Sequence, residues 1–71
     1  MKIELDIGDA INVATGLAVY AYKAIQAADE FPHSKVLVKA ADRKFALMNR
    51  YREAVTLPTL TVDELKEKFS R

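Results

Sequence analysis

The chain has 71 residues, no cysteine and a formal net charge of +1. This length allows one domain, residues 1–71, and the composition excludes disulfides and thiolate metal sites. Charge is uneven: residues 1–31 hold two basic and five acidic residues, whereas residues 32–55 hold six basic and two acidic ones. Because so short a chain buries a modest core, we expect close helix packing or oligomerisation to stabilise it.

The first segment, residues 2–7, alternates strictly between charged and apolar side chains. A period of two predicts a short, half-buried β-strand. Its pairing partner is either the extended stretch 55–61 or the same strand of a second molecule; an arm packed on the helices is the third alternative. Glu4 and Asp6 share the charged face and are candidates for contact with a basic partner, although such a pair more often keeps an edge strand soluble.

Residues 10–28 are apolar on nearly every side, and Asp9 is placed to cap a helix that we expect to end near Asp29. Polar residues interrupt this segment well before the roughly 20 apolar residues that a membrane span needs, so we interpret it as a buried helix of a soluble protein. The one line that can face solvent consists of Asn12, Gly16, Val19, Lys23, Gln26 and Glu30. The remaining surface needs cover from this chain or from a second copy.

Small residues recur at spacings of three and four along the same helix. Such spacing lets another helix approach closely, either within a hairpin or across a dimer. We predict a homodimer whose seam includes Ala14, Gly16, Ala18 and Ala21, or else the wide apolar face of the second helix. Since a helical glycine costs about 1 kcal/mol relative to alanine, Gly16 indicates a close contact, with a tolerated defect as the alternative.

Pro32 ends the first helix, and Ser34 is the predicted N-cap of a second helix over about 35–55. The apolar arc of this helix is wider than one antiparallel neighbour covers. Lys44 projects from the arc, which favours a packed stem with its ammonium in water over a buried functional lysine. The polar face presents four basic residues, and these are the candidate contacts for nucleic acid or an acidic partner: Lys35, Lys39, Arg43 and Arg50.

Residues 56–60 are expected to be extended, because Pro58 blocks a helix there. Thr61 and Glu64 form a capping box, which predicts a short helix to about Ser70. The elements together predict a mainly α fold. It is an antiparallel hairpin of two long helices with a short N-terminal β-strand and a short C-terminal helix.

Residues suited to chemistry are sparse. His33 is the one histidine and lies in a polar turn without an oriented acidic partner, so it is interpreted as a surface residue and not as a base or ligand. The chain has two glycines and no phosphate-binding loop. We therefore predict no enzyme, no metal site, no cofactor and no small-molecule substrate.

These patterns favour a non-enzymatic interaction protein that binds another macromolecule through a helix face, with a protein partner preferred over nucleic acid. Size alone favours an accessory or inhibitor protein of a bacterium or phage. The alternative is a small dimeric regulator that binds nucleic acid through the basic face of residues 35–55. The N-terminus has no apolar signal-peptide core, so a cytoplasmic location without membrane contact is expected.

Overall fold

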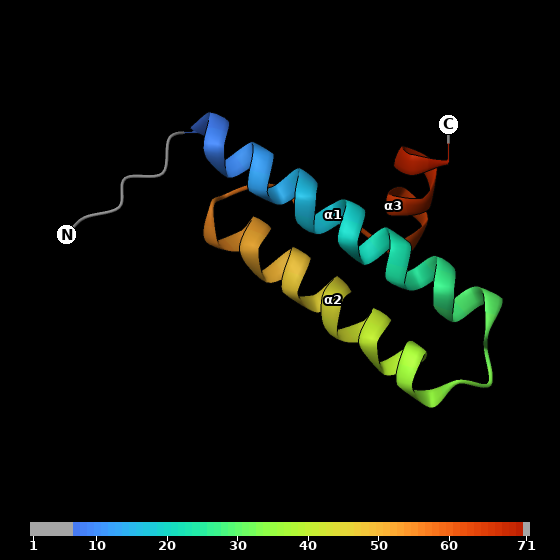
Figure 1. Cartoon of the computed structure of the whole chain (residues 1–71). Coiled ribbons are helices and arrows are strands. Elements are labelled where there is room, and N and C mark those ends of the chain that lie inside the picture. Colours follow the sequence, from blue (N-terminus) through green and yellow to red (C-terminus); the bar gives the residue numbers. More distant parts are fainter. Residues whose placement is uncertain (1–6, 71) are drawn as a thin grey trace.

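A computed structural model of the chain describes residues 7–70, with Ile7 described by its backbone alone. It contains three helices in chain order: α1 Ile7–Glu30, α2 Lys35–Ala54 and α3 Val62–Phe69. Helices α1 and α2 lie side by side as an antiparallel hairpin, and the short α3 lies on one side of this pair (Figure 1). The mainly α class predicted from the sequence is confirmed.

Helix α1 begins earlier than the sequence predicted. Ile7 is already helical, and Asp9 lies in the first turn rather than at the N-cap. The first turn accepts residues of low helix propensity because its amides have no partner within the helix, and a negative charge there suits the helix dipole. The predicted strand over residues 2–7 otherwise lies outside the described residues. No strand is present between residues 7 and 70.

The turn between the long helices follows the predicted chemistry. The amide of Phe31 donates to the carbonyl of Ala27 at 3.0 Å, which closes the last turn of α1. The Ser34 hydroxyl then accepts a hydrogen bond from the amide of Leu37 at 3.4 Å, so Ser34 is the N-cap of α2 as predicted.

Helix α2 ends in a Schellman motif. The amide of Leu57 donates to the carbonyl of Arg52 at 2.7 Å, and the amide of Thr56 donates to the carbonyl of Glu53 at 3.1 Å. Thr56 has a φ of 61°, the left-handed conformation that glycine usually supplies at this position. A β-branched residue there costs roughly 1–2 kcal/mol, so the sharp exit of the chain from α2 is strained.

The linker that follows is held to α2 by Asn49. Its side-chain amide donates to the carbonyl of Leu60 and accepts from the amide of Leu60, both at 2.9 Å. Arg52 Nε also donates to the carbonyl of Pro58. Both backbone groups of Leu60 are thereby used, so a strand that paired with residues 55–61 at this point would have to displace the Asn49 amide.

Helix α3 starts at the predicted capping box. The Glu64 amide donates to Thr61 Oγ1 at 3.2 Å, and the Thr61 amide donates to Glu64 Oε1 at 3.1 Å. This reciprocal pair fixes the direction in which α3 leaves the linker. Helix α3 consequently contacts α1, where the apolar side of α3 meets the hairpin.

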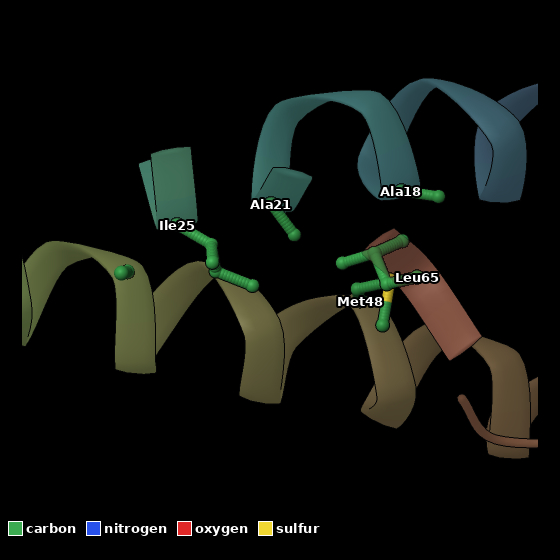
Figure 2. Packing of buried hydrophobic residues seen from close by; sticks show 6 residues of the cluster. Ala18, Ala21, Ile25, Met48 and Leu65 are labelled. Carbon is green, nitrogen blue, oxygen red and sulfur yellow. The ribbon is translucent and has the colours of Figure 1, made fainter. Parts of the chain in front are cut away.

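The core is thin and lies where the three helices meet. Figure 2 shows the side chains of Met48 and Leu65 interlocking beneath the small side chains of α1, and both are fully buried. The alanines of α1 allow this close approach, because a methyl group lets α2 and α3 come nearer to α1 than a longer side chain would. The buried residues are Ala10, Ala14, Ala18, Ala21, Ile25, Ala41, Met48 and Leu65.

Candidate protein-binding surface

Helix α1 carries two adjacent apolar lines. The first is buried in the hairpin and consists of Ala10, Ala14, Ala18, Ala21 and Ile25. The second repeats at alternating spacings of four and three, so it also forms one line on a helix. It consists of Val13, Leu17, Tyr20, Ala24, Ala27 and Phe31. In this second line Val13 is 44%, Tyr20 52% and Phe31 56% exposed.

Helix α2 supplies a matching line with the same alternation of spacings. Its members are Val36, Ala40, Arg43, Leu47, Arg50 and Ala54. Val36 is 77% and Leu47 51% exposed. We call the side of the hairpin formed by these two lines the open flank. The sequence prediction expected Val13 and Tyr20 to be covered by this chain or by a second copy, and it expected the apolar arc that includes Leu47 to be wider than one neighbouring helix covers.

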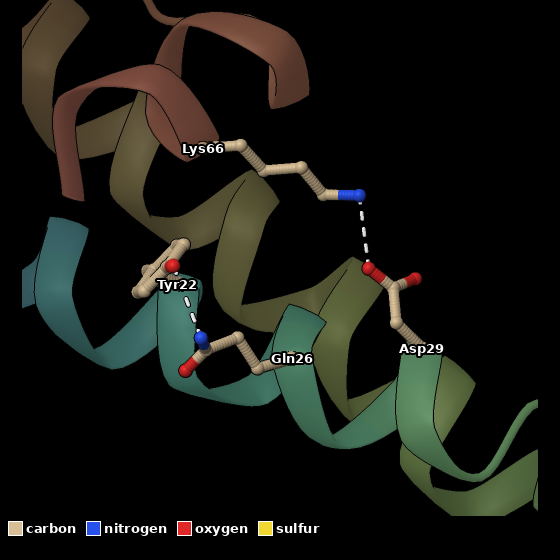
Figure 3. A network of polar contacts seen from close by, with 4 residues as sticks. All are labelled: Tyr22, Gln26, Asp29 and Lys66. Atoms are coloured by element: carbon tan, nitrogen blue, oxygen red, sulfur yellow. Dashed lines mark hydrogen bonds and ion pairs between the residues drawn. The ribbon is translucent and has the colours of Figure 1, made fainter. Parts of the chain in front are cut away.

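The other side of the hairpin, here called the covered flank, is occupied by α3. The rings of Tyr22 and Phe69 lie with their centroids 5.4 Å apart. Lys66 Nζ lies 2.9 Å from Asp29 Oδ2, and Gln26 donates to the Tyr22 hydroxyl at 3.0 Å (Figure 3). The hydrogen bond and the charge of Asp29 raise the pKa of Lys66 above its ordinary value. On the helix, Tyr22 points about 160° away from Tyr20, so α3 leaves the open flank uncovered.

A groove runs between α1 and α2 on the open flank and has a volume of about 250 Å³. Its walls are Tyr20, Lys23, Ala24, Ala27, Leu37, Ala40 and Lys44. The three alanines leave the space, because their methyl groups reach less far than the neighbouring side chains. Lys44 Nζ lies 4.2 Å from the centre of the Tyr20 ring, a cation–π contact that holds a positive charge beside the groove.

The predicted basic face is exposed along its whole length, because Lys35, Lys39, Arg43 and Arg50 all lie on the surface of α2. These four basic residues do not all lie on the same side of α2 relative to the open flank. Arg43 and Arg50 belong to the same line as Leu47, so they border the open flank. Lys35 lies further round the helix, away from that flank.

The structure places most of the first predicted dimer seam inside the hairpin. Ala14, Ala18 and Ala21 are at most 1% exposed, because they form the contact between α1 and α2 within one chain. A second copy cannot reach them without opening the hairpin. Gly16 is exposed, and a Cβ added there would meet nothing within 4 Å, so no close contact in this chain requires glycine. The homodimer stays a prediction, with the wide apolar face of the second helix as the alternative seam.

The remaining candidate residues form no constellation in the described part of the chain. His33 is exposed in the turn before α2. No three side chains able to hold a metal ion converge among residues 7–70. Glu4 and Asp6 lie outside the described residues. None of the helices described is both long and apolar enough to cross a membrane.

Comparison with protein-family models, with curated proteins and with solved structures finds no match to this chain. The function is therefore inferred from the surface itself. Its most distinctive property is the contrast between the two flanks of one helical hairpin.

Proposed function

We propose that the protein is a non-enzymatic interaction protein that binds another protein through the open flank. The observation that carries this proposal is the exposure of five large apolar side chains on one side of the hairpin and at its turn. They are Val13, Tyr20, Phe31, Val36 and Leu47, at 44–77%. Contiguous apolar surface that a small soluble protein leaves uncovered often marks a site of protein contact.

The residue types on the open flank fit this role. Tyrosine and arginine are enriched among the residues that contribute most to protein interfaces. Tyr20 stands on one helix, and Arg43 and Arg50 stand on the other, with Leu47 between them. Two packed helices hold these side chains on a rigid frame, so few backbone degrees of freedom are lost on binding.

A pull-down from the native host tests the proposal. Leu47→Asp and Tyr20→Asp place a charge in the open flank, and each is expected to reduce capture of the partner at least tenfold. Thr59→Asp is the matched control, because Thr59 is exposed in the linker. Circular dichroism of each variant checks that the helices remain. Equal capture by the wild type and both flank variants would contradict the proposal.

Nucleic-acid binding is the second candidate function. It is favoured by the continuous exposure of Lys35, Lys39, Arg43 and Arg50, none of which forms an ion pair within residues 7–70. This function predicts binding to mixed-sequence DNA that weakens steeply with salt. Lys35→Glu should then weaken DNA binding at every salt concentration. The same variant should leave capture of a protein by the open flank intact, because Lys35 lies away from that flank, and this separates the two candidates.

A further inference from the structure

The charges that border the middle of the open flank share one sign. Lys23 and Lys44 line the groove, and Arg43 and Arg50 stand in the outer line of α2. We propose that the open flank binds an amphipathic helix of the partner protein whose apolar stripe is bordered by acidic residues. This inference rests on the proposed function and specifies the chemistry of the partner.

None of the described acidic residues lies in the middle of the open flank. Asp29 pairs with Lys66 on the covered flank, and Asp42 lines a separate hollow beside Val62 at the start of α3. Glu53 lies at the C-terminal end of α2, about 100° from the centre of the outer line and 60° from Arg50. Asp63, Glu64 and Glu67 belong to α3, and Asp9 and Glu30 occupy the two ends of α1. The middle of the open flank therefore presents positive charge without an internal counter-charge.

The shape of the groove suits a helix. Its volume of about 250 Å³ is below the roughly 300–1,000 Å³ of small-molecule sites, but it accommodates large apolar side chains that project from one helix. Three of the seven residues that line it are alanines, from both helices, so a partner helix can approach α1 and α2 closely. Recognition of an apolar helix face in such a groove is a recurrent mode of peptide binding, with anchors at i, i+3, i+4 and i+7.

Charge argues against a second copy as the occupant. A two-fold dimer places the same surface of both chains face to face. The basic side chains of one open flank would then oppose those of the other, and like charges brought together oppose association. Acidic residues beside the partner's apolar stripe would instead pair with Lys44, Arg43 and Arg50, which raises the association rate and fixes the register of the helix.

A displayed library of helical 20-residue peptides tests the inference, with both the apolar stripe and its two borders randomised. The wild-type protein is expected to enrich peptides with Asp or Glu at the borders at least tenfold over those with Lys or Arg. Arg43→Glu with Arg50→Glu is expected to reverse this preference. Lys35→Glu with Lys68→Glu is the matched control, since it reverses two exposed charges away from the open flank and should keep the preference for acid.

The outcomes separate the inference from the proposed function. Enriched peptides whose binding is lost in Leu47→Asp but which have no acidic border would overturn the inference and leave the proposed function standing. Both the inference and the proposed function would be overturned by two results together. No enriched peptide would depend on Leu47, and Leu47→Asp and Tyr20→Asp would capture the host partner as well as the wild type does. A dimer in sedimentation equilibrium that Leu47→Asp dissociates would overturn the inference in favour of a second copy. Salt-sensitive DNA binding that Arg43→Glu with Arg50→Glu abolishes would overturn it in favour of nucleic acid.

Discussion

The covered and open flanks belong to the same two helices and differ by one short helix. On the covered flank, α3 places Leu65 at 0% exposure and brings Phe69 against Tyr22. On the open flank, Leu47 and Tyr20 remain half exposed. The same kind of apolar pattern along α1 and α2 therefore forms core on one flank and exposed surface on the other. Which flank becomes core depends on where eight residues at the other end of the chain dock.

The largest expected effect comes from replacing leucine by alanine on the covered flank, compared with the same replacement on the open flank. Leu65→Ala removes a fully buried side chain and should lower the free energy of unfolding by about 2–5 kcal/mol, enough to unfold much of so small a domain. Leu47→Ala on the open flank should lower it by less than about 1 kcal/mol. Urea denaturation followed by circular dichroism measures both. Equal losses would mean that Leu47 is buried in solution, as in a dimer.

The attachment of the linker is the next test. Asn49→Ala leaves the amide and carbonyl of Leu60 without their partner and should cost about 1–3 kcal/mol. Hydrogen exchange at the Leu60 amide should accelerate in this variant. Asn12→Ala is the control, because Asn12 is exposed on α1. If Asn49→Ala were as stable as this control, the linker would be held by other contacts.

Gly16 tests whether anything packs closely against the exposed side of α1. Because an added Cβ meets open space there, Gly16→Ala should stabilise the folded chain by about 1 kcal/mol. Thermal denaturation at several protein concentrations measures this. A loss of stability that grows with concentration would instead indicate a second chain packed at Gly16.

The smallest effect concerns the ion pair that fastens α3 to α1. Asp29 raises the pKa of Lys66, so the folded state binds the lysine proton more tightly than the unfolded state does. The resulting stabilisation is fully present below the ordinary lysine pKa of 10.5 and is lost as pH rises through the higher folded value. Asp29→Asn should reduce this part of the alkaline fall in stability. An unchanged alkaline profile in Asp29→Asn would show that the pair is open in solution.

Local features of the fold could be predicted from the sequence. Ser34, Thr61 and Glu64 form hydrogen bonds with groups only three residues away, so their spacing alone specified the starts of α2 and α3. Pro32 ended α1 within one residue of the expected position. Such signals depend on neighbours along the chain and need no knowledge of the tertiary arrangement.

Features that depend on distant contacts were missed. Asn49 binds Leu60, eleven residues away, and nothing in its position on α2 marked it for that role. Alanine at 14, 18 and 21 is equally suited to an intrachain and an interchain contact, so spacing could not decide between them. The candidate site was only partly predicted, because Arg43, Arg50 and the wide apolar arc of α2 were identified whereas the exposure of Tyr20 was not.

The molecule is a thin slab, with extents of 44 × 28 × 14 Å. The open flank is one broad side of a hairpin whose core lies a single helix layer below it. A molecule that binds this flank in the folded chain alone raises the free energy of unfolding, by about 2.7 kcal/mol at a concentration one hundred times its Kd. For a domain of this size each kcal/mol corresponds to roughly 4–8 °C in Tm. A rise in the melting temperature can therefore be used to screen host fractions for a molecule that binds the open flank.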